Sequence, residues 1–191
     1  MAQRTAQNIR LSNYILREAP DEISGPLLAL WRSSLLSLLS CFGGFYSVAG
    51  TAQDPAIVAS ALIKVRQASI SHHATEAPPM SLDDPAVVQA GARAFATRGC
   101  VNCHGGPGVK WAKFSEGLNP SPPDLKDVVG VLEARELFWV VKNGINMTGM
   151  PSFGEIGVPD QEIWSIAAFL KKLPGVSDQD YKTWTASSGT N

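Results

Sequence analysis

The run Cys-Val-Asn-Cys-His at residues 100–104 constrains this chain more than any other feature. Cysteine pairs at this spacing serve disulfide exchange, zinc sites or covalent haem attachment, and each use requires different residues elsewhere. A structural zinc site needs four ligands, and Cys41 or the pair His72 and His73 would complete it poorly. A redox-active pair belongs at the start of a helix that follows a strand, but the sequence shows no strand-like alternation. The zinc and redox uses are therefore disfavoured.

Covalent haem attachment accounts for every position of this motif. Cys100 and Cys103 would add to the haem vinyl groups, because the two intervening residues let one helical turn span the thioethers. His104 follows the second thioether directly and would be held under the iron as the proximal ligand. The motif therefore predicts one covalently bound haem c.

A second axial ligand is predicted in residues 143–154, a loop rich in glycine and proline. Met150 is the candidate, because Gly149 lets the backbone come close to the haem and Pro151 makes the loop rigid. Met147 is the alternative, but it has no adjacent proline. The predicted iron ligands are thus a histidine and a methionine, which fill both axial positions.

Length and composition narrow the class of protein. A chain of 191 residues can bury one core of ordinary size together with an additional segment. The 16 basic residues nearly balance the 17 acidic ones, unlike the strongly basic surface of nucleic-acid-binding proteins. Three cysteines are too few for a small fold held together by disulfides.

The N-terminal part is predicted to be a polar tail at residues 1–25 and a membrane anchor at residues 26–50. Residues 33–49 lack charge and would span about 25 Å as a helix, against about 30 Å for a hydrocarbon core. Four arginines precede this run, which favours a cytoplasmic N-terminus. A cleaved signal ending near residues 49–52 and a lipoprotein signal at Cys41 are alternatives. All three place the rest of the chain across the bacterial inner membrane, in the periplasm.

The remaining chain is predicted to contain an amphipathic stretch and linker at 51–80, a core domain at 81–175 and a polar C-terminal extension at 176–191. The core domain is predicted to be all-α, because its apolar residues recur at helical spacing without strand-like alternation. The predicted helices lie within residues 83–99, 128–144 and 159–175.

Residues 84–173 resemble the class I c-type cytochrome family. The resemblance rests on the cysteine-histidine motif, on Met-Pro-Ser-Phe at 150–153, on a first helix with Gly91 and Phe95, and on the order of these parts. It implies an all-α class I cytochrome c-like domain around one covalent haem, preceded here by an N-terminal transmembrane helix. It also implies that the first and last helices cross at Gly91, with Phe95 near Phe169.

The resemblance further assigns roles to residues around the haem. In the family, a proline carbonyl accepts the proton on the far nitrogen of the haem-binding histidine, and Pro123 is positioned for this role toward His104. Leu125 would lie against the haem face, and Phe153 completes the haem-binding set. The alternative is that Pro122 and Pro123 only interrupt a surface loop.

These features predict an electron-transfer protein and not an enzyme. Filled axial positions leave no site for an external ligand, so the haem would exchange single electrons with redox proteins such as a periplasmic or membrane dehydrogenase, oxidase or reductase. Two alternatives remain: the chain is a cytochrome subunit of a larger membrane complex, or it is a haem enzyme or gas sensor with a labile distal ligand. No nucleic-acid partner is expected.

Overall fold

The computed structural model describes residues 21–186, which divide between residues 49 and 50 into two units. The described part of the first unit contains helix α2 (Asp21–Phe42). Of the helices in the described part of the chain, none is both long enough and apolar enough to cross a membrane. The predicted transmembrane helix is therefore not confirmed. Most of the predicted tail, residues 1–20, lies outside the described residues.

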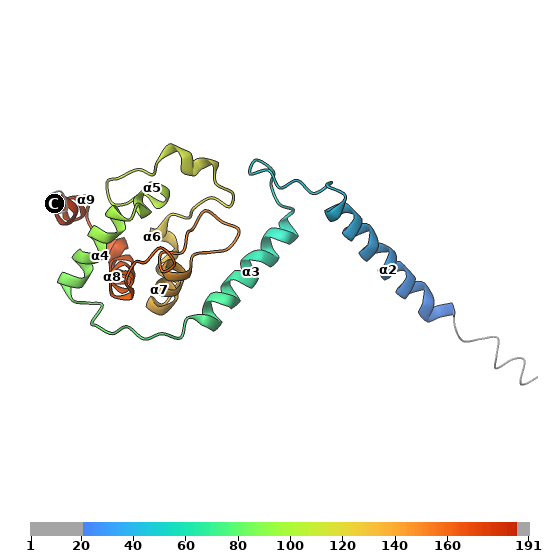
Figure 1. Ribbon diagram of the computed structural model, residues 1–191, viewed down its shortest axis with the longest axis horizontal. Helices are drawn as coiled ribbons and strands as arrows, with labels where there is room; N and C mark the ends of the chain where they lie inside the picture. The colour runs from blue at the N-terminus through green and yellow to red at the C-terminus, as the bar shows by residue number, and fades with distance from the viewer. Residues whose placement is uncertain (1–20, 187–191) are drawn as a thin grey trace, which may run out of the picture. The chain divides into compact units, whose positions relative to one another are not determined.

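The second unit is helical, and residues 50–186 contain no named strand (Figure 1). The all-α prediction is confirmed. The elements in chain order are α3 (Ala56–His73), α4 (Pro85–Thr97), α5 (Cys100–His104), the 3-10 helix η1 (Lys113–Gly117), α6 (Leu125–Val128), α7 (Ala134–Asn143), α8 (Asp160–Lys172), the 3-10 helix η2 (Leu173–Gly175) and α9 (Asp178–Ala186).

Helix α4 begins and ends where its sequence dictates. The Asp84 side chain accepts a hydrogen bond from the Ala86 backbone N–H at 2.8 Å, and Pro85 occupies the first helical position, where no N–H partner is needed. Gly99 follows the helix with a φ of 79°, a left-handed conformation that glycine adopts without strain. This turn directs the chain into α5.

Helices α4 and α8 cross at Gly91, as the family resemblance implied. A Cβ atom at Gly91 would lie 1.8 Å from the Ser165 carbonyl oxygen and 2.9 Å from the Phe169 Cβ, so only glycine fits here. The rings of Phe95 and Phe169 pack next to this crossing with centroids 5.4 Å apart. The predicted proximity of these two rings is confirmed.

Helix α8 forms the centre of the core. All eight residues from 163 to 170 are buried, which places apolar side chains against neighbours on every side. Trp164 stacks on Phe138 of α7 with centroids 4.1 Å apart and an interplanar angle of 10°. The core is therefore built mainly from α4, α7 and α8, with aromatic rings at both helix contacts.

The predicted helix at residues 128–144 is wrong at its start, because the chain forms two helices here. The short helix α6 ends at Val128, and α7 begins at Ala134. The backbone N–H of Glu133 donates to the Glu136 side chain at 2.9 Å, in a capping box that starts α7 anew. Local capping thus overrides the apolar pattern that joined the two segments.

The segments on either side of the core domain each contain a helix. Helix α3 is largely exposed, and of its apolar residues only Ile70 is buried. His73 is the last residue of α3, and its ring stacks on Trp139 of α7 with centroids 6.0 Å apart. At the other end, the polar extension contains helix α9, which packs on α4 and includes the buried residue Tyr181.

Candidate functional site

Helix α5 brings the two thiols and the imidazole onto a single turn. Gly99 and Gly105 limit this five-residue helix, and both have positive φ values, 79° and 66°. Cys100 and Cys103 are free, half-buried thiols. Burial, with a smaller contribution from Cys103, raises the pKa of the Cys100 thiol to about 12. At neutral pH this sulfur is therefore protonated and not a thiolate.

His104 is held in one orientation by the backbone of a distant loop. Its Nδ1 lies 3.0 Å from the carbonyl oxygen of Pro123. A carbonyl oxygen can only accept a hydrogen bond, so this contact requires the proton on Nδ1. The Nε2 atom then keeps its lone pair for another partner. Asp124 fixes the loop, since its side chain accepts from the Lys126 N–H at 2.9 Å and caps α6.

A cavity of about 580 Å³ lies beside His104. Leu125 from α6 and Leu173 from η2 contribute apolar walls, and the predicted haem-face residue Leu125 thus lines the same cavity as His104. Trp111 also lines this cavity and is 50% exposed. The thiols and Met150 are not among its lining residues.

The loop between α7 and α8 distinguishes the two candidate methionines. Met147 is 87% exposed and has a positive φ of 59°. Met150 is half-buried and packs against the hydrophobic core. Its backbone N–H donates to Thr148 Oγ1 at 3.1 Å, and its carbonyl accepts from the Ile145 N–H at 3.2 Å. Two backbone contacts therefore hold Met150 in place.

Two glycines allow this loop to approach its neighbours. A Cβ at Gly144 would lie 2.7 Å from the Met150 carbonyl oxygen, so the end of α7 touches the loop backbone directly. A Cβ at Gly149 would lie 2.9 Å from Leu118 Cδ1. The neighbour that Gly149 accommodates is thus the Leu118 side chain, which the sequence interpretation did not identify.

Phe153 completes the group of predicted residues. It is 6% exposed, and its backbone N–H donates to the Val141 carbonyl of α7 at 3.2 Å. Cys100, Leu125 and Met150 are partly buried against the same hydrophobic core to which Phe153 belongs. The core therefore connects α5, α6 and the methionine loop, although these segments are far apart in the sequence.

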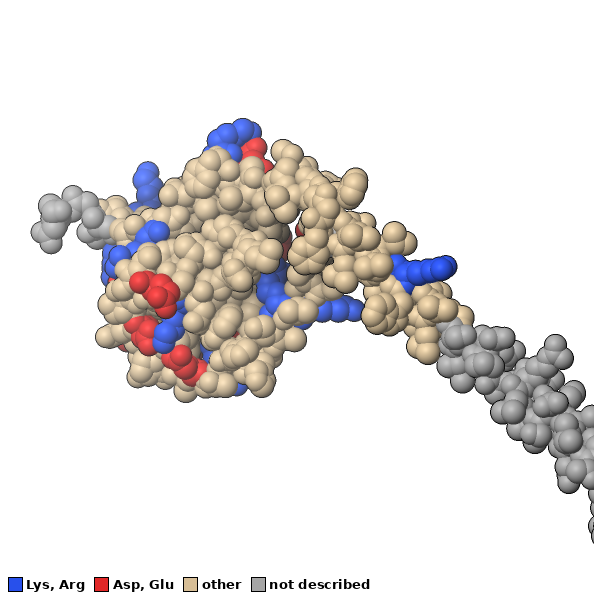
Figure 2. Space-filling view, turned by 45° about the vertical axis from the view of Figure 1, so that its right-hand side comes forward, with Lys and Arg blue, Asp and Glu red and all other residues tan. Residues whose placement is uncertain are grey.

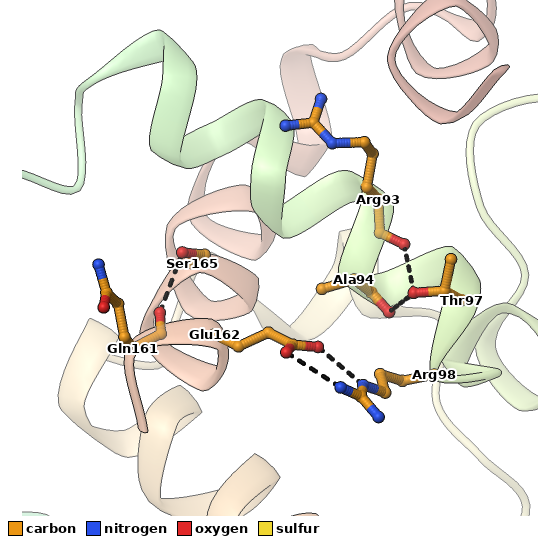
Figure 3. Close-up of polar contacts among 7 residues, drawn as sticks. All are labelled: Arg93, Ala94, Thr97, Arg98, Gln161, Glu162 and Ser165. Carbon is orange, nitrogen blue, oxygen red and sulfur yellow. Dashed lines mark hydrogen bonds and ion pairs between the residues drawn. The ribbon is translucent and has the colours of Figure 1, made fainter. Parts of the chain in front are cut away.

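An ion pair fastens the end of α4 next to α5. Arg98 donates from Nε and Nη2 to the two carboxylate oxygens of Glu162, at 2.7 and 3.0 Å (Figure 3). This carboxylate raises the pKa of the Arg98 guanidinium. Thr97 Oγ1 donates back to the Arg93 carbonyl at 3.0 Å, and Ser165 Oγ donates to the Gln161 carbonyl at 3.0 Å. The ion pair joins the start of α8 to Arg98, two residues before the motif, while the other two hydrogen bonds lie within α4 and within α8.

Tyr181 is a buried residue near this site that sequence reasoning missed. It is 3% exposed and its ring stacks on Phe169, with centroids 5.7 Å apart. The local signal was weak, because the surrounding segment Ser-Asp-Gln-Asp-Tyr-Lys-Thr-Trp at 177–184 is mostly polar. The local indication of burial was that Tyr181 and Trp184 are three residues apart, a spacing that places both rings on the same face of a helix.

Charge and metal-ligand clusters do not define a different site. On the face shown in Figure 2, Lys and Arg side chains and Asp and Glu side chains are scattered between larger areas of other residues. Across residues 21–186, no group of three or more His, Cys, Asp or Glu side chains is placed to hold a metal ion. The zinc alternative therefore gains no support.

Comparison with known proteins identifies the domain that contains these residues. Residues 86–170 match the family model described as "Cytochrome C oxidase, cbb3-type, subunit III". The match begins within α4 and ends within α8, so it includes the motif at 100–104 and the methionine loop. No curated protein and no solved structure gives a significant match.

Proposed function

Because residues 86–170 form a c-type cytochrome domain, and this family carries covalently bound haem c, we propose that the chain is a monohaem electron carrier with histidine and methionine as iron ligands. The observation that carries the proposal is the pair of contacts that position His104 and Met150. His104 Nδ1 donates to the Pro123 carbonyl, and Met150 is held half-buried against the core. When bound, haem c supplies an iron that accepts and releases one electron.

The residues present fit this group. Cys100 and Cys103 are free thiols on one helical turn, as two thioether bonds require. His104 keeps its Nε2 lone pair available because Nδ1 carries the proton. The cavity beside His104 and the apolar side chain of Leu125 provide room and a nonpolar wall.

The protein's own residues set the properties of the site. The Pro123 carbonyl fixes the imidazole orientation and increases the basicity of Nε2. The buried Phe153 ring keeps water away from the core side of the methionine loop. Met150 offers a soft thioether sulfur, which favours the reduced iron and raises the reduction potential. Gly144 and Thr148 hold the loop in place, so little reorganisation accompanies electron exchange.

The distal ligand is tested by comparing Met150→Ala with its matched control Met147→Ala. In the oxidised wild-type holoprotein we expect the weak charge-transfer band that is typical of methionine bound to ferric haem, and the reduced protein should resist carbon monoxide. Met150→Ala should abolish the band, lower the reduction potential and admit carbon monoxide, because alanine has no lone pair. Met147→Ala should leave all three unchanged, since its side chain is 87% exposed.

Two results would change this interpretation. Loss of the band in Met147→Ala would assign the ligand to the exposed methionine and leave the electron-carrier function intact. A wild-type protein without the band that binds carbon monoxide at once would have an open coordination position. The haem enzyme or gas sensor would then be the better description.

A second candidate function is supported by the family match, whose printed description is a subunit of an oxidase. In this version the domain is a cytochrome subunit that passes electrons within a larger membrane complex, and not a freely diffusing carrier. Purification in mild detergent distinguishes the two, because a subunit should co-purify in fixed ratio with its partner proteins. A carrier should elute alone and exchange electrons with the same proteins after mixing.

We further propose that residues 26–50 direct the haem domain to the periplasmic side of a bacterial inner membrane, as an uncleaved segment or a cleaved signal. The support is the uncharged run at 33–49 and the four arginines that precede it. N-terminal sequencing of the mature protein separates the two versions. Release of the full-length chain by salt alone would contradict an uncleaved, membrane-inserted segment.

A further inference from the structure

The hydroxyl group of Ser152 connects the methionine loop to the end of helix α7. Ser152 Oγ donates to the Lys142 carbonyl oxygen at 2.7 Å and accepts from the Glu155 backbone N–H at 3.1 Å. The side chain is half-buried and lies two residues after Met150. The family resemblance gives Met150 a role toward the haem, but it gives none to Ser152, so the hydroxyl is a feature of this chain that the proposed function has not used.

The acceptor of this hydrogen bond is a carbonyl that α7 itself cannot satisfy. Lys142 lies in the last turn of α7, where the backbone carbonyls have no N–H partner within the helix. Two groups of the methionine loop donate to it instead, namely Ser152 Oγ and the Gly154 backbone N–H at 2.9 Å. The Phe153 N–H donates in the same way to the preceding carbonyl, that of Val141. The loop therefore caps the C-terminus of α7.

The end of α7 is a fixed point to which the loop can be held. Lys142 Nζ donates to Asp160 Oδ2 at 2.9 Å, at the first residue of α8, and to Glu76 Oε1 at 3.4 Å. One turn earlier in α7, Phe138 stacks on Trp164 of α8. Because both helices that flank the loop are held together, the loop can open only by losing its own contacts with them.

The contact at Ser152 restricts Met150 through the backbone that joins them. Pro151 lies between the two residues and fixes one of the backbone dihedrals. This backbone passes directly over the end of α7, because a Cβ atom at Gly144 would lie 2.7 Å from the Met150 carbonyl oxygen and 2.8 Å from the Ser152 nitrogen. Holding Ser152 against α7 thus keeps the Met150 backbone in place as well.

We propose that Ser152 is a positioning residue for the distal ligand, whose hydroxyl holds the methionine loop against α7 and so keeps the distal coordination position closed to external ligands. The inference rests on the proposed function, in which Met150 binds the iron. Release of Met150 requires the loop to move away from α7, and the hydrogen bond to the Lys142 carbonyl favours the closed loop because it exists only in that state.

The test replaces Ser152 by alanine in the full-length holoprotein and measures the displacement of Met150 from ferric iron by added imidazole, followed at the methionine charge-transfer band. Ser152→Ala should raise the equilibrium constant for displacement about fivefold, which corresponds to the loss of one net hydrogen bond. The Lys142 carbonyl keeps its hydrogen bond from the Gly154 N–H, so the substitution leaves this acceptor with a partner. The effect is therefore confined to the lost contact.

Amide hydrogen exchange gives a second readout that does not depend on the haem spectrum. The Phe153 and Gly154 amides keep their own acceptors, the Val141 and Lys142 carbonyls, when Ser152 is replaced. In Ser152→Ala both amides should nevertheless exchange faster, by a factor similar to that for imidazole displacement, because the loop opens more often.

Two further variants separate positioning from a general effect on stability. Ser152→Thr keeps the hydroxyl and should restore both the wild-type displacement constant and the wild-type exchange rates. Ser165→Ala is the matched control, because it removes a serine hydroxyl that donates to the Gln161 carbonyl at 3.0 Å within α8. Its loss frees no loop, so both readouts should remain those of the wild type.

The outcomes distinguish this inference from the proposed function. A wild-type holoprotein without the methionine band would contradict the assignment of Met150, and the inference would fail with it. A wild-type protein that shows the band, but whose imidazole displacement is the same in Ser152→Ala, would overturn only the role of Ser152. A lower Tm with unchanged displacement would likewise reduce Ser152 to a structural residue, and a Ser152→Thr variant that behaves like Ser152→Ala would exclude the hydroxyl as the cause.

Discussion

Replacing Gly91 by alanine should separate the two helices at the centre of the domain. The added Cβ would lie 1.8 Å from the Ser165 carbonyl oxygen, and real Cβ atoms essentially never come closer than 3.0 Å to such an atom. The α4 and α8 backbones must therefore move apart by about 1.2 Å at the crossing. Because the obstructing atom belongs to the backbone, no change of side-chain rotamer relieves the contact.

The expected loss of stability follows from two opposing effects. Overpacking a core contact costs about 3 kcal/mol at the upper end of the usual range, while alanine gains about 1 kcal/mol over glycine inside a helix. The net destabilisation is about 2 kcal/mol, which corresponds to a decrease in Tm of about 8 °C for a domain of this size. Holoprotein yield should also fall, since α4 positions α5 and its two thiols.

Thermal unfolding of the full-length holoprotein, followed by circular dichroism, measures this effect. Gly130→Ala is the matched control, because it adds the same methyl group where no atom lies within 4 Å. The control should keep the wild-type Tm within about 2 °C, as expected for a substitution that touches nothing. Equal Tm values for Gly91→Ala and Gly130→Ala would refute the argument, because the helices would then not be in direct contact at Gly91.

Three further predictions concern the core and the charged groups. Trp164→Ala should destabilise the domain by about 3–5 kcal/mol in urea unfolding, since Trp164 is 2% exposed and stacks on Phe138; a loss below about 1 kcal/mol would contradict this packing. Glu162→Gln should cost less than about 1 kcal/mol and leave haem content unchanged, because its ion pair with Arg98 is partly exposed. Wild-type stability should fall as pH rises from about 10 to about 12, because the unfolded chain loses the Tyr181 proton before the folded protein does. The same titration of Tyr181→Phe should show a smaller fall, and identical curves would exclude this contribution.

Local patterns in the sequence were sufficient for the elements that depend on neighbouring residues. Asp84 and Pro85 define the start of α4 through capping, and the apolar spacing of residues 159–175 predicts α8. The motif at 100–104 fixes the thiols and the histidine on one turn by its spacing alone. The family resemblance added the helix crossing at Gly91, which spacing along the chain does not reveal.

The sequence favoured Met150 over Met147 from its neighbouring proline, but burial supports that choice only in the folded chain. Both methionines lie in the same glycine-rich loop, and the loop's contacts with α7 hold one inward while the other is 87% exposed. Likewise, the break before α7 depends on a capping box at Glu133 that competes with an unbroken apolar pattern.

Tyr181 shows why the sequence predicts local elements but not which side chains are buried. Spacing along the sequence determines which residues a few positions apart lie on the same face of a helix, because backbone geometry fixes their separation. Burial depends on segments that meet only after folding, and α9 reaches the core through a contact with Phe169 that lies 12 residues earlier in the chain. A tyrosine in a polar segment carries no local signal of this contact. The sequence by itself therefore determined the cysteine-histidine motif and the helices α4 and α8, and the tertiary structure decided the break before α7 and which side chains are buried.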